Sequence, residues 1–274
     1  MKNVCVITGG GSGMGLATAH IMGKDHYVIL VGRTAAKLEN AVNELKEEGI
    51  EAEAFAADVG NHQSIQKLAA HAAKLGNIRA LIHAAGLSPH MGDAELIMRG
   101  NALGTIYMNE AFYEVMGAGA CIINVSSMSA YLTPKFIMPT RLYKYAMTDN
   151  QVFMRKMMTR INMMPKSQRA NIAYGVSKNF VIWYAKHMAV KMGEKGIRIL
   201  SVTPGNFETP MGKLEEKEAS SYVKYCAIKR FGKPEEIAEL MVFCASEKPG
   251  FLTGCDILCD GGCVASGVNP LKMR

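Results

Sequence analysis

The sequence predicts an α/β fold, a doubly wound parallel sheet with helices on both faces. The main observation is a recurring pattern, in which apolar runs rich in β-branched residues alternate with helix-like stretches. No internal repeat or low-complexity tract interrupts it. With 274 residues, of which 49% are hydrophobic and 20% charged, the chain can fill one α/β core. We therefore expect a single domain over residues 1–274.

Seven apolar runs are the expected strands. They are VCVIT at 4–8, YVILV at 27–31, AEAFAADV at 52–59, ALIHAA at 80–85, CIINVS at 121–126, IRILSVT at 197–203 and CDILCD at 255–260. Strands that alternate with helices form right-handed βαβ crossovers, so all seven should be parallel. In such sheets, ligands bind at the carboxyl ends of the strands.

The amino terminus and the cysteines indicate where the protein is found. The apolar run within residues 1–10 is too short for a signal peptide or a membrane span. Seven cysteines, an odd number lying mostly in apolar runs, suit a reducing compartment. We therefore expect a cytoplasmic protein with no membrane partner. Cys255, Cys259 and Cys263 match no standard zinc spacing, so no metal is expected.

The formal net charge of +7 comes from one segment. Residues 133–170 contain eight basic residues and one acid, Asp149, whereas the rest of the chain has 23 of each sign. The basic residues are Lys135, Arg141, Lys144, Arg155, Lys156, Arg160, Lys166 and Arg169. The segment has no recognition motif for nucleic acid, so no nucleic-acid partner is expected.

A glycine-rich turn, TGGGSGMG at 8–15, links the first strand to a helix-like stretch. Its glycines permit a tight turn and let backbone N–H groups and the helix N-terminus approach a pyrophosphate. The order strand, turn, helix predicts a dinucleotide-binding site of the Rossmann type rather than a structural turn. The expected cofactor contacts in the turn are Gly9, Gly11, Ser12, Gly13, Met14 and Gly15.

The end of the second strand predicts which dinucleotide binds. Val31, Gly32 and Arg33 provide no carboxylate for the ribose hydroxyls of NAD, and Arg33 can pair with a 2′-phosphate. We therefore favour NADP(H); the alternative is that Arg33 is a solvated loop charge. Asp58 and Val59, after the third strand, are placed to meet the adenine, although an Asp there also serves as a helix cap.

Tyr174 and Lys178 stand four apart in a helix-like stretch and so share one face. The Lys178 ammonium and a positively charged nicotinamide would favour the phenolate and lower the pKa of Tyr174 from about 10. Tyr174 could then donate and accept a proton. By itself such a pair is an ordinary surface contact. It becomes informative beside the strand end CIINVSSMS, which offers Ser126, Ser127 and Ser129 to a substrate oxygen.

These motifs resemble the short-chain dehydrogenase/reductase family over essentially the whole chain. The family's motifs are matched in order by Thr8, Gly9, Gly13 and Gly15 (TGxxxGxG), His83, Ala84, Ala85 and Gly86 (NNAG), Asn101, Ser127, and Tyr174 with Lys178 (YxxxK). His83 departs from the family's asparagine and leaves open how that strand end is hydrogen-bonded. A later PGxxxT motif is matched by PGNFET, with Pro204, Gly205, Phe207 and Thr209.

The resemblance implies an NADP(H)-dependent oxidoreductase that interconverts a secondary alcohol and a ketone by direct hydride transfer. Ser127 and Tyr174 would bind the carbonyl oxygen, and Lys178 would hold the nicotinamide ribose. Asn101 would anchor a water chain. The NNAG and PGxxxT matches would contact the cofactor, as would Tyr174 and Lys178. A homodimer or homotetramer is also implied. The spacing of Tyr174 and Lys178 disfavours an enoyl reductase, in which this gap is longer.

Ser127 and Tyr174 are 47 positions apart, far more than in most short members of the family. We expect the additional segment, about 132–170, to be helical and to lie beside the active site. It carries seven methionines: Met138, Met147, Met154, Met157, Met158, Met163 and Met164. Methionines adapt to bulky apolar ligands, and Arg and Lys bind acidic groups.

Together with NIAYGVSKN, this segment resembles the insertion of hydroxysteroid dehydrogenases. We interpret it as a lid over an apolar substrate, a steroid or an anionic bile acid. The alternative is an element that packs against a neighbouring subunit and carries solvated charges.

Two other functions remain open. A 3-oxoacyl carrier protein reductase, or another small-ketone reductase, would use the same motifs, but a small extended substrate needs no large lid. A binding protein that senses NADP without catalysis is the alternative outside enzymes. A vacant serine, tyrosine or lysine position would favour it, and none of the three is vacant.

Overall fold

The computed structural model describes residues 2–214 and 216–268 and contains a seven-stranded, fully parallel sheet. The strands are β1 Lys2–Thr8, β2 Tyr27–Gly32, β3 Ala52–Ala56, β4 Gly76–His83, β5 Cys121–Val125, β6 Arg198–Pro204 and β7 Asp256–Cys259. Their order is β3-β2-β1-β4-β5-β6-β7, which reverses direction between β1 and β4. In doubly wound sheets such a reversal opens a crevice for ligands. The predicted fold class is confirmed.

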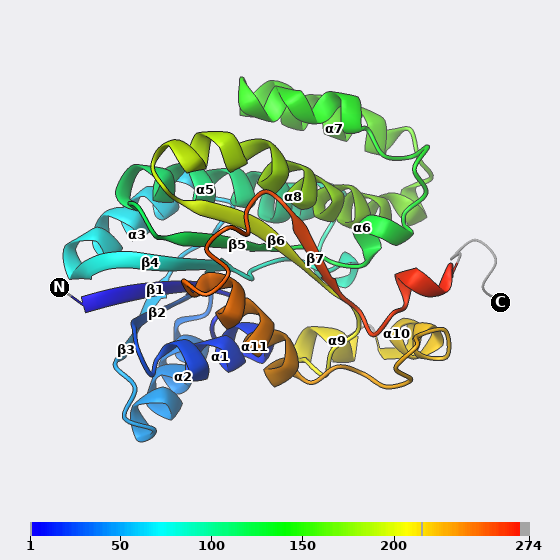
Figure 1. The fold of residues 1–274 in the computed structure, drawn as a ribbon. Coiled ribbons are helices and arrows are strands. Elements are labelled where there is room, and N and C mark those ends of the chain that lie inside the picture. Colours follow the sequence, from blue (N-terminus) through cyan, green and yellow to red (C-terminus); the bar gives the residue numbers. More distant parts are fainter. Residues whose placement is uncertain (1, 215, 269–274) are drawn as a thin grey trace.

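Helices cover both faces of the sheet (Figure 1). One face carries α1 Gly13–Met22, α2 Ala35–Glu47 and α11 Pro234–Ala245, and the other carries α3 His62–Leu75, α4 Ala94–Met98, α5 Gly104–Val115 and α8 Arg169–Glu194. Each layer packs its own apolar core against the sheet. Every side chain of the central strand β5 is buried, as expected when helices cover both faces.

Short elements make up the rest of the described structure. They are α6 Ser129–Leu132, α9 Pro210–Leu214, α10 Glu216–Val223, the 3₁₀ turns η1 Pro89–Met91, η3 Thr140–Met147, η4 Lys166–Gln168 and η5 Val264–Ser266, and the π-helical turn η2 Arg99–Leu103. α6, α9 and α10 lie beyond the carboxyl ends of the strands (Figure 1). None of the helices described is both long and apolar enough to cross a bilayer.

The segment 132–170 is helical, as predicted, and contains η3, α7 Asn150–Asn162 and η4. The Asp149 carboxylate caps α7 by accepting hydrogen bonds from two backbone N–H groups at 2.8 and 2.9 Å. Phe153, Met157 and Ile161 recur at helical spacing and are fully buried. The Phe153 ring lies 4.7 Å from that of Phe180 on α8, measured between centroids. The segment therefore packs on α8 of its own chain, where Figure 1 also shows α7.

Candidate active site

A cavity of about 780 Å³ lies at the carboxyl ends of the strands, where the turns after β1, β4, β5 and β6 meet. All eighteen residues predicted to contact a cofactor line it, as does Ser127. The eighteen are Gly9, Gly11, Ser12, Gly13, Met14, Gly15, Arg33, Asp58, Val59, Ala84, Ala85, Gly86, Tyr174, Lys178, Pro204, Gly205, Phe207 and Thr209. The fold thus brings residues from most of the chain to one surface.

The glycine turn forms one wall of the cavity. Gly9 and Gly13 have φ of 70° and 56°, which L side chains rarely adopt. A Cβ on Gly15 would lie 2.5 Å from the Gly9 carbonyl oxygen, so no side chain fits there. Helix α1 begins at Gly13, directly on this wall. The turn therefore offers an anion a close backbone and a helix N-terminus, which suits a pyrophosphate.

The residues after β2 and β3 form the end of the cavity that would hold the adenosine. Arg33 lines it, and so does Lys37 of α2, which the sequence analysis missed. Lys37 packs beside the glycine turn, since its Cγ would lie 3.3 Å from a Cβ on Gly11. The available signal was a second basic residue four positions after Arg33. The Asp58 carboxylate accepts a hydrogen bond from Gly60 N at 2.9 Å and so holds its own turn.

Lys178 lines the cavity and is 6% exposed. Its Nζ donates a hydrogen bond to the Val125 carbonyl oxygen at 2.9 Å and lies 5.9 Å from the centroid of the Tyr174 ring. Ser126 Oγ donates to the Lys178 carbonyl oxygen at 2.8 Å. A Cβ on Gly86 would approach Nζ to 3.1 Å, so the absence of a side chain there makes room for the ammonium.

Ser127 lies at the start of the loop after β5 and faces the same cavity as Tyr174. Its hydroxyl donates to Ser129 Oγ and accepts from Ser129 N, both at 3.3 Å. These are long bonds. The end of α6 packs closely against α8, because a Cβ on Gly175 would collide with Thr133, the residue after α6. The absence of a side chain at Gly175 thus lets the segment that follows Ser127 approach the helix that carries Tyr174.

Asn101 is placed differently from the other three predicted catalytic residues, because it does not line the cavity. Its amide donates to the Leu87 carbonyl oxygen at 3.0 Å and to Ser177 Oγ at 3.1 Å, and accepts from Leu87 N at 2.7 Å. The side chain therefore ties the loop after β4 to α8. It stands in the π-helical turn η2, a geometry often found at functional sites. Its water chain stays a prediction.

The structure shows how His83, which departs from the family motif, is hydrogen-bonded at the end of β4. The buried ring places Nδ1 2.9 Å from Thr8 Oγ1, which also accepts a hydrogen bond from Ala85 N at 3.0 Å. Burial, reinforced by the nearby Lys178 ammonium, lowers the pKa of His83 to about 3. A neutral His83 thus joins the ends of β1 and β4, where the glycine turn meets Ala84 and Ala85.

The remaining wall, away from the glycine turn, is mostly apolar, with the amides of Gln168 and Asn171. Its apolar residues include Met91, Leu96, Met128, Leu132, Ile137, Ile172, Tyr222 and Phe231. The segment 133–170 reaches the cavity through Thr133, Pro134, Ile137 and Gln168, but the expectation that its methionines and basic residues meet the substrate is not met, since none of them lines the cavity; the lid itself stays a prediction. The physical reason is the packing on α8: Met157 is buried there, four further methionines pack against the same core, and Met147 and Met163 face outward.

Comparison with known proteins identifies the family. The family model described as short chain dehydrogenase matches residues 3–139, and the model described as enoyl-(acyl carrier protein) reductase matches residues 136–264. The chain is 28% identical to short-chain dehydrogenase/reductase bsc3 of Alternaria brassicicola, over 96% of each chain. It is 27% identical to 3-oxoacyl-[acyl-carrier-protein] reductase FabG of Thermotoga maritima, over 95% of this chain and 97% of that one.

Solved structures agree on the fold. A short chain dehydrogenase from Burkholderia cenocepacia, determined in complex with NADP, superimposes with a TM-score of 0.77 at 21% identity, over 96% of this chain and 98% of that one. The family models, together with a parallel sheet in the order expected of a doubly wound fold, lead to one conclusion. The chain is an oxidoreductase that belongs to the short-chain dehydrogenase/reductase family.

Proposed function

We propose that this oxidoreductase uses NADP(H) to interconvert a ketone and a secondary alcohol, with Tyr174 as the proton donor and acceptor. The observation that carries the proposal is the single cavity in which the glycine turn, Ser127, Tyr174 and Lys178 meet. A nucleotide fits the glycine turn because the positions where Cβ atoms would fill the cradle are glycines. When bound, NADPH supplies the hydride.

In ketone reduction, the hydroxyls of Ser127 and Tyr174 hydrogen-bond the carbonyl oxygen and hold it in place. The oxygen gains negative charge during the reaction. Tyr174 Oη–H then breaks and a new O–H bond forms on the substrate, which leaves a phenolate. The Lys178 ammonium, fixed by the Val125 carbonyl oxygen, favours that phenolate electrostatically. In alcohol oxidation the same proton moves in the opposite direction.

The choice of NADP(H) rests on charge at the end of β2. Arg33 and Lys37 line the cavity there, and no carboxylate stands at the end of that strand. A carboxylate would accept the ribose hydroxyls of NAD, whereas two cations attract a 2′-phosphate. Asp58, an acid that also lines this end of the cavity, accepts a hydrogen bond from Gly60 N.

For the substrate we propose a steroid-sized ketone or alcohol that is apolar and uncharged. The apolar wall supports a bulky hydrophobic skeleton, and the amides of Gln168 and Asn171 suit a neutral oxygen at its rim. Among the residues that the structure describes, the other cations of the wall, apart from Lys178, belong to the nucleotide end: Arg33, Lys37, and Arg99 beside Gly60. A bile-acid carboxylate would thus find no partner among them, so the neutral steroid is favoured.

A second candidate is the reduction of a 3-oxoacyl thioester. The similarity to the Thermotoga maritima reductase, named for that reaction, favours it. The catalytic residues would act in the same way on either substrate. Only the wall beyond Ser127 and Tyr174 distinguishes them, because a thioester chain is narrow and a steroid is broad.

The test is the consumption of NADPH in the presence of three groups of ketones: neutral ketosteroids, keto bile acids and a 3-oxoacyl thioester. NADH is the matched cofactor control. We expect turnover of at least one neutral ketosteroid regioisomer, with NADPH preferred. Turnover of the thioester alone would replace the steroid proposal by the second candidate. The absence of turnover with every ketone, while NADPH still binds, would contradict the proposed reaction.

A further inference from the structure

None of the basic residues of segment 133–170 lines the cavity, so the proposed reaction gives them no role. Six of the eight are exposed: Lys135, Arg141, Lys144, Arg155, Arg160 and Lys166. We call these six the basic face. Among the residues that the structure describes, none of the six forms an ion pair. The sole acid of the segment, Asp149, is used as the cap of α7.

The packing of α7 directs part of this charge outward. Phe153, Met157 and Ile161 occupy the inward stripe, so Arg155, two positions after Phe153, lies on the opposite side of the helix. Met163 follows the last residue of α7 and is exposed. Lys156 is half-buried, and its Nζ lies 4.6 Å from the Tyr145 ring centroid. Lys144 Nζ lies 5.7 Å from the same ring, so η3 and α7 present neighbouring cations.

Large apolar side chains are exposed on the same segment. Phe136 is 79% exposed, Met163 71% and Met147 45%. Single exposed apolar residues are ordinary on protein surfaces. Segment 133–170 thus exposes three large apolar side chains and the six cations of the basic face, a combination of the kind that contacts lipid headgroups and the acyl chains below them.

Both ends of the segment reach the cavity wall. Pro134 and Ile137 line it at one end and Gln168 at the other. Phe136 lies between Pro134 and Ile137 in the sequence, and its ring is exposed to solvent. The exposed apolar and basic side chains therefore begin at the rim through which an apolar substrate would enter.

We propose that the basic face, with Phe136 and Met163, docks the protein on an anionic lipid surface. A second copy of this chain does not fit the face, because a symmetric contact would bring like charges together. An acidic protein would match the charge but would not explain the exposed phenylalanine and methionines. The proposal departs from our expectation of no membrane partner, which rested on the lack of a spanning segment. The idea that docking delivers the substrate rests on the proposed apolar substrate. The docking proposal itself does not depend on which substrate is used.

The test is sedimentation of the full-length protein with vesicles of phosphatidylcholine alone or mixed with phosphatidylglycerol. We expect binding to the mixed vesicles, with little binding to phosphatidylcholine alone. The triple variant Lys144→Gln, Arg155→Gln, Arg160→Gln should bind at least about tenfold more weakly. Its matched control is Lys24→Gln, Lys46→Gln, Lys67→Gln, which removes equal charge from exposed positions on other elements and should bind like the wild type. Phe136→Ser should also weaken binding.

Three results would overturn the proposal: no binding to the mixed vesicles, an equal loss in the control variant, or equally tight binding of polyglutamate, which would indicate a site for acidic chains in general. Vesicle binding is measured without turnover. Its failure is therefore distinguishable from failure of the proposed reaction, which would show as no NADPH consumption with water-soluble ketones. All these variants should retain wild-type turnover of a water-soluble ketone.

Discussion

The Thr8 hydroxyl lies at the junction of β1 and β4. It accepts the hydrogen bond from Ala85 N and lies 2.9 Å from His83 Nδ1. Burial keeps the His83 ring neutral by lowering its pKa. Gly9 lies at the same junction: a Cβ on it would approach the backbone of Ala84 and Ala85 to 3.1 Å. Thr8 and His83 thus lie where the glycine turn packs against the end of β4.

We predict that His83 makes the fold sensitive to acid. Its pKa is about 3 when folded, against about 6.5 when unfolded, so the unfolded chain takes up the proton first. The stability that depends on a neutral ring is complete above about pH 6.5 and is lost as the pH falls toward 3. Relative to His83→Asn, the wild type should lose about 2 kcal/mol of unfolding free energy between about pH 7 and pH 5. Denaturant titrations measure this loss. The same difference in unfolding free energy between the wild type and His83→Asn at both pH values would contradict this assignment.

We predict that Arg33 and Lys37 select the 2′-phosphate. Arg33→Ala or Lys37→Ala should raise the Kd for NADPH by about ten- to a hundredfold, because each removes a charge-assisted hydrogen bond. The Kd for NADH should change little. Lys46→Ala, on the same helix α2 but away from the cavity, is the control. Equal weakening of both cofactors, measured by nucleotide fluorescence, would show that the two cations serve the turn and not the phosphate.

At the scale of elements, α7 should stabilise the fold through its inward stripe. Phe153→Ala removes a fully buried ring from the contact with Phe180 and should lower the unfolding free energy by about 3–5 kcal/mol. Arg155→Ala, on the outward side of the helix, should change it by less than about 0.5 kcal/mol. Denaturant unfolding measures both. Similar values for the two variants would mean that α7 does not pack on α8 as described.

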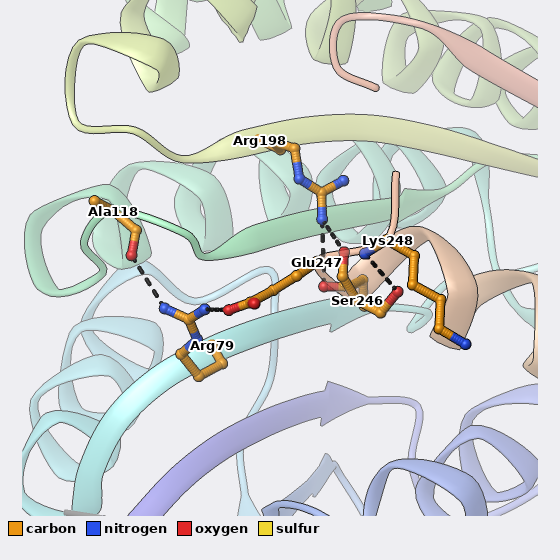
Figure 2. Close-up of polar contacts among 7 residues, drawn as sticks. Arg79, Ala118, Arg198, Ser246, Glu247 and Lys248 are labelled. Atoms are coloured by element: carbon orange, nitrogen blue, oxygen red, sulfur yellow. Dashed lines mark hydrogen bonds and ion pairs between the residues drawn. The ribbon is translucent and has the colours of Figure 1, made fainter. Parts of the chain in front are cut away.

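Helix α11 ends against a guanidinium (Figure 2). Arg198, the first residue of β6, donates to the carbonyl oxygens of Cys244, Ala245 and Ser246 at 2.8, 3.3 and 2.6 Å. Helix carbonyls at a C-terminus lack partners within the helix, so these bonds satisfy them. Nearby, Arg79 joins the Ala118 carbonyl oxygen to the Glu247 carboxylate. These contacts lie toward the amino ends of the strands, opposite the cavity, and stabilise the fold.

We therefore predict that Arg198→Leu separates stability from activity. The variant leaves several carbonyl oxygens without a donor and should lose about 1–3 kcal/mol of unfolding free energy. Its kcat and KM at a temperature where it stays folded should match the wild type, because β6 begins at the edge away from the cavity. A selective fall in kcat would indicate that the strand transmits the change to the site.

For the whole molecule, the sequence predicted the sheet and the nucleotide end of the cavity wall because these depend on local patterns. Each strand is a short apolar run, and the glycine turn is contiguous in the chain. The predicted ends were less accurate: β3 ends at Ala56, since Asp58 begins a turn, and β4 begins at Gly76, before its apolar run. Lys37 was missed because its part in the wall depends on how α2 meets the glycine turn.

The residues of segment 132–170 that reach the cavity could not be predicted from the sequence. The spacing of Phe153, Met157 and Ile161 was available as a helical stripe, but nothing in the sequence says whether such a stripe packs on a neighbouring helix or on a ligand. Only the tertiary contacts with α8 decide it. Asn101 illustrates the same limit, because its partners, Leu87 and Ser177, come from distant parts of the chain.

The central claim is that Tyr174 transfers the proton during hydride transfer with NADPH. The most direct measurement is a single turnover of a ketone substrate, followed by NADPH absorbance, in the wild type and in Tyr174→Phe. We predict that Tyr174→Phe binds NADPH with nearly the wild-type Kd while the rate of NADPH consumption falls by about a hundred- to ten-thousandfold. A variant that binds NADPH and consumes it at the wild-type rate would contradict the claim.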